Sequence, residues 1–187
     1  PDIARNVSPA VMSYHGIQYQ SMAPEVMDAE QLTWLQSHLW ILSGLYGCVR
    51  PFHAVEPYRL EMGAKLAVDN ACDLYAFWDD KLARAIAPAG SNTTIVNLAS
   101  VEYAKAVLPY LTADAAVVTC LFGEGVRNGK PIQRSTVSKK ARGSMVRWMA
   151  ENRLEDASGL TAFDVGYRHI PELSNHNTLV FLNEQTL

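Results

Sequence analysis

Basic side chains recur along one predicted helix, and cations in that arrangement could bind phosphate groups. The spacing predicts a helix over Lys139–Leu154, with Ser138 as its capping residue. At about 100° per residue, the apolar residues fall on one side of this helix, and they are Ala141, Met145, Trp148 and Met149. The opposite half carries the cations Lys139, Lys140, Arg142, Arg147 and Arg153. Because a helix N-terminus already attracts anions, the first of these cations favour a phosphate or nucleic-acid site.

Gly143 lies in the middle of that basic half. A glycine inside a helix costs roughly 1 kcal/mol relative to alanine, so its presence indicates that something approaches the helix closely there. Two interpretations stay open. Either the basic half is a phosphate or nucleic-acid site, or it is a solvated surface and another helix crosses at Gly143.

A second candidate is the turn Gly44-Leu45-Tyr46-Gly47. A helix is predicted from Asp28, with Gln31 as its capping-box partner, and it is expected to end at Gly44. The turn resembles that of a helix-hairpin-helix motif, in which backbone N–H groups of a glycine-containing hairpin contact a DNA phosphate. The resemblance implies DNA contacts along Gly44, Leu45, Tyr46 and Gly47, with Arg50 as a nearby cation. That motif has its glycines two apart, whereas here they are three apart. A helix C-cap followed by a tight turn is the alternative.

Polar residues follow this turn closely in the sequence, and they are Arg50, Tyr58, Arg59 and Glu61. An arginine can bind phosphate or carboxylate through two parallel hydrogen bonds, and Glu61 could serve as a general base. Glu102 is a second candidate for proton transfer, because it follows a predicted strand and opens a helix capped by Ser100. A buried ion-pair network and simple helix capping explain the same residues without any ligand.

Composition narrows the possible functions. The net charge is −3 and 49% of the 187 residues are hydrophobic, which counts against indiscriminate coating of nucleic acid but leaves room for a local basic surface. No apolar run approaches the ~20 residues of a membrane span. Three scattered cysteines suit a reducing cytosol. The histidines and cysteines show no metal-binding spacing, and no phosphate-binding glycine loop occurs, so neither a metal nor a cofactor is expected.

The predicted elements mix strands and helices. Strands are predicted at residues 58–62, 93–98, 115–122 and 178–183. Residues 124–131 contain Arg127-Asn128-Gly129-Lys130, which is typical of a hairpin turn, and residues 132–137 are expected to return as the partner strand. Helices are predicted at 73–87 and 101–107, and a short turn or helix at 161–167. The 115–122 strand is almost entirely apolar and is expected at the centre of the sheet. With one antiparallel hairpin among these elements, the α+β class is favoured, as a single mixed-sheet domain with flanking helices.

Four sequence blocks together resemble the YaaA family of peroxide-stress resistance proteins. They are LSGLYGCVRP, EPYRLEMG, NLASVEY and SKKARG with the following ENRL. The resemblance runs from about Ser13 to the C-terminus. It implies that an N-terminal strand and helices of the family fold are missing, so the chain, which opens at Pro1, is expected to be an incomplete YaaA-like domain over residues 1–187. Another chain could then cover the surface that the missing part would occupy.

The resemblance implies a cytosolic protein that binds double-stranded or distorted DNA and limits iron-dependent (Fenton) damage during peroxide stress. The sequence shows no set of iron ligands, so direct iron storage is not expected. For this function we expect phosphate contacts on the basic half of the helix, with the Gly44–Gly47 turn beside them, and these contacts are Lys139, Lys140, Arg142 and Arg147. The other candidate phosphate- or DNA-binding residues are Arg50, Tyr58 and Arg59.

Two other functions remain open. In the first, the chain is an enzyme for a small phosphorylated or nucleotide-like substrate, with Arg50, Arg59 and Lys140 holding the anion and Glu61 or Glu102 moving protons. In the second, the charges pair internally and the role is structural.

Overall fold

The computed structural model describes residues 7–186, which form two compact units. Unit 1 contains residues 7–14, 35–93 and 99–115, and unit 2 contains residues 15–34, 94–98 and 116–186. Pro1, on which the expectation of a missing N-terminal part rests, lies outside the described residues. Mixed α and β structure is confirmed in the described part of the chain. None of its helices is long and apolar enough to cross a membrane.

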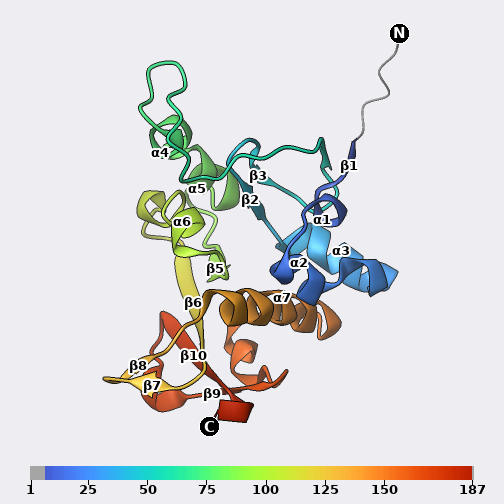
Figure 1. Ribbon diagram of the computed structural model, residues 1–187, viewed down its shortest axis with the longest axis vertical. Coiled ribbons are helices and arrows are strands. Elements are labelled where there is room, and N and C mark those ends of the chain that lie inside the picture. Colours follow the sequence, from blue (N-terminus) through green and yellow to red (C-terminus); the bar gives the residue numbers. More distant parts are fainter. Residues whose placement is uncertain (1–6, 187) are drawn as a thin grey trace. The chain divides into compact units, whose positions relative to one another are not determined.

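A four-stranded mixed sheet forms the centre of unit 2 (Figure 1). Its order is β5 (Thr94–Asn97), β6 (Ala116–Gly123), β10 (Thr178–Asn183) and β9 (Tyr167–His169), with β5, β6 and β10 parallel and β9 antiparallel. β6 therefore has a neighbour on each side, as its apolar sequence predicted. The three long strands fall where β-branched and apolar residues predicted them.

The long helix α7 (Ser135–Glu151) packs its apolar side against this sheet. Ala141 and Met145 are fully buried together with Phe122, Phe163 and Phe181, and Trp148 and Met149 pack at the edge of the same cluster. The predicted core stripe of the helix is therefore confirmed. Ring contacts among the three phenylalanines, with centroids 5.4–6.1 Å apart, make this cluster the main core of the unit.

The remaining elements of unit 2 are short. They are α2 (Ile17–Met22), the 3₁₀ turns Pro24–Val26, Ala157–Ala162, Pro171–Leu173 and Glu184–Thr186, and the hairpin of β7 (Val126–Arg127) and β8 (Lys130–Pro131). The hairpin was predicted at this position, but its return strand is β8, and the prediction of a strand over 132–137 is wrong, because these residues lead into the helix that begins at Ser135. Asn128 and Gly129 take φ values of 51° and 72°, as a two-residue turn requires.

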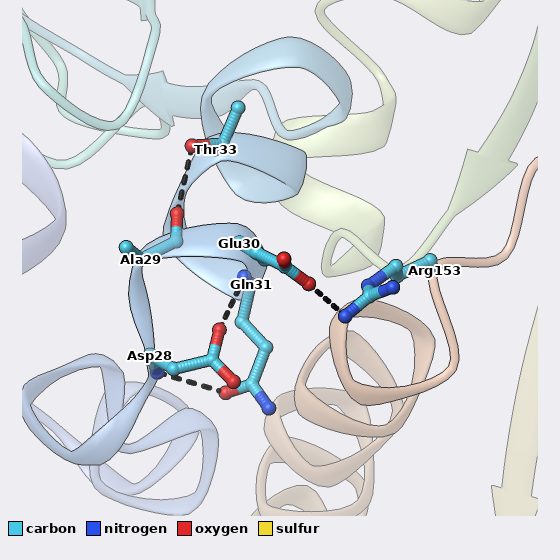
Figure 2. A network of polar contacts seen from close by, with 6 residues as sticks. All are labelled: Asp28, Ala29, Glu30, Gln31, Thr33 and Arg153. Atoms are coloured by element: carbon cyan, nitrogen blue, oxygen red, sulfur yellow. Dashed lines mark hydrogen bonds and ion pairs between the residues drawn. The ribbon is translucent and has the colours of Figure 1, made fainter.

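The helix α3 (Ala29–His38) begins with the predicted capping box (Figure 2). The Gln31 backbone N–H donates to Asp28 Oδ1 at 2.9 Å, and the Asp28 N–H donates to Gln31 Oε1 at 3.1 Å. The neighbouring Glu30 carboxylate pairs with Arg153, which follows α7 in the sequence. A local signal thus starts the helix, and a long-range ion pair attaches its first turn to the end of α7.

Unit 1 is built from short elements around its own core. They are β1 (Ser8–Pro9), α1 (Ala10–Ser13), β2 (Ile41–Ser43), β3 (Gly47–Val49), β4 (Ala54–Val55), α4 (Leu74–Trp78), α5 (Lys81–Ile86), α6 (Val101–Ala104) and the 3₁₀ turn Leu108–Tyr110. β1 pairs with β4 and β2 with β3, both antiparallel. Met62, Leu74, Leu82 and Val107 are buried in this core.

Several predicted boundaries in unit 1 are wrong. The helix expected over 73–87 starts with Asp73 as its cap, but it breaks at Asp79, which has a φ of 46°. Residues 58–62 form no strand, and the helix at 101–107 keeps regular α geometry only to Ala104. Ser100 caps it as predicted, since its side chain accepts from the Tyr103 N–H.

The largest correction concerns the helix expected to end at Gly44. It ends at His38, and Ile41–Ser43 form a strand that pairs with Gly47–Val49. The flanks of the Gly44–Gly47 turn are therefore two strands, so the turn belongs to a β-hairpin and neither the helix-hairpin-helix flanks nor the helix C-cap is observed.

Candidate nucleic-acid interface

The basic side chains of α7 differ in how much of their charge other groups neutralise. Lys139 and Lys140 are exposed, and no carboxylate of residues 7–186 pairs with them. Arg147 pairs with Glu151 at 2.7 Å, one helical turn away. Arg153, beyond the helix end, pairs with Glu30. Two lysines of the predicted set are thus available to an external anion.

Arg142 is the third cation of this part of the helix, and it is half-buried. Its Nε is buried and has no hydrogen-bond partner among the described residues. Burial lowers the pKa of its guanidinium, because a cation removed from water loses hydration.

Ser138 does not cap α7 as predicted. The helix starts one turn earlier, at Ser135, and Ser138 is buried with its hydroxyl donating to the Phe122 carbonyl at 3.3 Å. Lys139 and Lys140 consequently lie in the second turn, so the dipole of the helix N-terminus contributes less to anion binding there than the sequence suggested.

Gly143 is explained by the protein's own packing. A Cβ added at Gly143 would lie 2.0 Å from the Gln18 carbonyl oxygen and 3.0 Å from the Met22 nitrogen. The backbone of α2 therefore crosses α7 at this point, and the interpretation of Gly143 as a close helix crossing is confirmed. The glycine supplies no evidence for a ligand.

The acid-free stretch around α7 was not recognised from the motifs. Seven of the sixteen Lys and Arg residues, and none of the nineteen Asp and Glu residues, lie between positions 125 and 150. They are Arg127, Lys130, Arg134, Lys139, Lys140, Arg142 and Arg147. All belong to unit 2. A count of charge by segment would have found this strongly basic stretch in a chain whose net charge is −3.

The Gly44–Gly47 turn has internal partners for its backbone. The N–H groups of Leu45 and Tyr46 donate to Ser43 Oγ at 3.2 and 2.9 Å, and the Trp78 indole donates to the Gly44 carbonyl at 3.0 Å. A Cβ at Gly44 would lie 2.7 Å from the Leu60 carbonyl oxygen, and Gly47 has a φ of 74°. Both glycines are thus required for chain folding, and the amides that would face a phosphate already have an acceptor.

Hydroxyl groups gather beside this turn. Tyr58 is hydrogen-bonded to both Ser43 and Tyr14, the latter at an oxygen separation of 2.9 Å. Burial is the main cause that raises the pKa of the Tyr14 phenol, so it remains protonated at neutral pH. Burial also raises the pKa of the Cys48 thiol despite Arg50 two residues away, which makes Cys48 an inert thiol rather than a reactive one.

Arg50 contacts backbone carbonyl groups and an aromatic ring. Its Nη1 donates to the Ser37 and Leu39 carbonyls at 2.9 and 3.3 Å, and its guanidinium carbon lies 3.8 Å from the centre of the Trp40 ring. Burial lowers its pKa. These contacts lie at the end of α3, where the last carbonyls of a helix lack partners.

Replacing Arg50 with glutamine is expected to lower the free energy of unfolding by about 1–3 kcal/mol, because hydrogen bonds from a charged group and a cation–π contact are lost together. Thermal unfolding followed by circular dichroism would measure this loss. Arg59→Gln is the control, since the Arg59 side chain is 94% exposed. Equal melting temperatures for the two variants would contradict a structural role for Arg50.

The two candidate carboxylates also lie in unit 1. Glu61 is exposed and 3.9 Å from Arg59, while Glu102 Oε1 accepts from the Gly63 N–H at 2.8 Å. Burial, and then the negative charge of Glu102, raise the pKa of Tyr103. The proposed cations Lys139, Lys140, Arg142 and Arg147 lie in unit 2.

Comparison with known proteins identifies the family. The family described as "Peroxide stress protein YaaA" matches residues 2–173. The chain belongs to this family. A UPF0246 protein of Pediococcus pentosaceus is 45% identical over 185 residues, which cover 98% of this chain and 72% of that protein. One from Lacticaseibacillus casei is 47% identical over 182 residues, covering 97% of this chain and 72% of that protein. Membership supports a role of this YaaA-family chain in peroxide stress.

Proposed function

We propose that this YaaA-family chain binds duplex DNA through the basic stretch of residues 125–150 in unit 2 and thereby protects the DNA during peroxide stress. The observation that carries the proposal is the distribution of charge. An acidic protein that concentrates cations in one segment, with no carboxylate among them, has a local surface suited to a polyanion.

Lys139 and Lys140 are the phosphate contacts best supported by the structure, because they are exposed and unpaired among the described residues. Arg142 adds a half-buried guanidinium with an unsatisfied Nε. Arg147 would have to exchange Glu151 for a phosphate. The Gly44–Gly47 turn and Arg50 are left out of the proposed contacts, because their donors are already engaged within unit 1.

The enzyme alternative has weaker support. Glu61 and Glu102 both lie near Tyr103, but Glu102 is bonded to a backbone amide and Glu61 is exposed beside Arg59. A phosphorylated substrate also needs cations with free donors, and Arg50 spends its Nη1 on two carbonyl groups. The DNA proposal is therefore preferred.

The test is the salt dependence of binding to a duplex of about 20 base pairs. Each lost phosphate contact makes the negative slope of log K against log salt less steep by about 0.9. The double variant Lys139→Gln with Lys140→Gln should therefore reduce the steepness by about 2. It should also weaken binding on the order of tenfold or more near 0.1 M salt. Lys65→Gln with Lys105→Gln makes the same charge change in unit 1 and should leave the slope unchanged. Equal slopes for both double variants would refute the proposal.

Protection follows from the same contacts. Plasmid nicking by ferrous iron and hydrogen peroxide should be reduced by the unmodified protein and less so by the Lys139/Lys140 variant, at concentrations where only the former is bound. Equal protection by both proteins would show that the protection does not depend on DNA binding through Lys139 and Lys140, which would contradict this part of the proposal.

A further inference from the structure

The β7–β8 hairpin carries two cations on one face. Arg127 and Lys130 are directly opposite each other across the antiparallel pair, and opposite residues in such a pair point to the same side of the ribbon. Both are exposed, and no carboxylate of the described chain forms an ion pair with either. The adjacent residues Asn128 and Gly129 form a small tip, and a Cβ at Gly129 would meet nothing within 4 Å.

The base of the hairpin is firmly held. The Glu124 N–H donates to the Ile132 carbonyl at 3.0 Å, and the Ile132 N–H donates to the Gly125 carbonyl at 2.8 Å. A Cβ at Gly123 would lie 2.8 Å from the Pro131 Cβ, so the returning strand packs directly on the end of β6. Arg134 pairs with Glu124 at 2.8 Å across the same base. The tip is therefore carried by a fixed ribbon, which costs little ordering entropy on binding.

The ribbon extends from the sheet of unit 2 (Figure 1). On its second face Val126 lies opposite Pro131 and is 47% exposed. An exposed apolar side chain behind two unpaired cations makes a ribbon with a charged face and an apolar face. The major groove of B-DNA offers matching surfaces, namely phosphates and acceptor atoms on the purine edges and the methyl groups of thymine.

We propose that the β7–β8 hairpin enters the major groove of DNA, with Arg127 and Lys130 directed to phosphates or base edges. This inference rests on the proposed function, because it specifies how that same basic stretch contacts its ligand. Groove dimensions decide between the two grooves. A two-stranded ribbon fits the major groove, which is about 12 Å wide, whereas the undistorted minor groove is only about 6 Å wide. The deep, narrow major groove of an RNA duplex would exclude it.

The experiment compares binding of the unmodified protein to one sequence in four forms. They are plain DNA, DNA whose cytosines are replaced by glucosylated 5-hydroxymethylcytosine, DNA saturated with the minor-groove ligand distamycin, and the RNA duplex. The glucose groups fill the major groove, so we expect affinity to fall about tenfold or more with glucosylated DNA and with RNA, and to change less than twofold with distamycin.

Arg127→Gln with Lys130→Gln should weaken binding to plain DNA and should remove most of the difference between plain and glucosylated DNA. Circular dichroism melting shows whether this variant keeps its fold, and the Lys139/Lys140 variant is the matched control, since it should lose affinity while keeping the discrimination. Equal binding to plain and glucosylated DNA, or sensitivity to distamycin instead, would overturn the hairpin proposal while leaving DNA binding intact. Absence of binding to all four duplexes would overturn both proposals.

Discussion

Gly143→Ala is expected to lower the free energy of unfolding by about 1–3 kcal/mol. Overpacking a close-packed site costs about 1–3 kcal/mol and occasionally more, and the added methyl would lie 2.0 Å from the Gln18 carbonyl oxygen. That oxygen belongs to backbone, so it cannot rotate away, and α2 would have to separate from α7. The gain of roughly 1 kcal/mol in helix propensity offsets only part of this cost.

Thermal and urea unfolding would measure the change, with an expected decrease of about 5–10 °C in the melting temperature. Gly125→Ala is the matched control, because a Cβ there meets nothing within 4 Å and the residue has no positive φ. If Gly143→Ala melted at the same temperature as Gly125→Ala, the α2–α7 crossing would not be as close as described.

Ser43→Ala is expected to lower the free energy of unfolding by about 2–3 kcal/mol. Ser43 is 1% exposed, and its hydroxyl oxygen accepts from the Leu45 and Tyr46 amides and bonds the Tyr58 hydroxyl. Removing it leaves these groups without their partner, and a buried polar group that loses its partner costs about 1–3 kcal/mol. Because the turn is partly exposed, water can replace some of the lost hydrogen bonds, so the expected cost is smaller than the sum of the separate penalties.

Ser91→Ala is the control for this substitution, since the hydrogen bond between the Ser91 and Thr93 hydroxyls, at 2.6 Å, is exposed. Exposed substitutions usually change stability by less than about 0.5 kcal/mol. A Ser43→Ala variant as stable as Ser91→Ala would show that the turn does not depend on the serine. In that case the Leu45 and Tyr46 amides would not need the serine hydroxyl as their acceptor, and they could donate to a phosphate, as the sequence suggested.

Elements defined by neighbouring residues were predictable. The capping box of Asp28 and Gln31 and the Asn128-Gly129 turn each depend on contacts within a few positions. The strand β6 was recognisable from its apolar run, although its pairing partners β5 and β10 are distant in the sequence. The core side of α7 followed from its 3.6-residue period, although its start did not. Ser138 resembles a helix cap, but its hydroxyl bonds the Phe122 carbonyl of a distant strand, and no local pattern reveals such a partner.

The end of α3 shows the same limit. Leucines at helical spacing continue through Leu42, yet the helix ends at His38 because Arg50 donates to the Ser37 and Leu39 carbonyls and β3 pairs with the next residues. The partners that replace the next helical turn come from residues 47–50. Their arrival depends on the folding of unit 1 as a whole.

The sequence by itself determined the family, the mixed α/β composition, the central strand and the concentration of cations near α7, because all of these depend on residue identity and short spacing. Only the tertiary structure decided which cations are free. It paired Arg147 and Arg153 with carboxylates, engaged Arg50 with carbonyls and left Lys139 and Lys140 exposed. It also assigned Gly143 to the crossing with α2. The physical reason is that charge is a property of a residue, whereas its neutralisation depends on which groups the folded chain brings within a few ångströms.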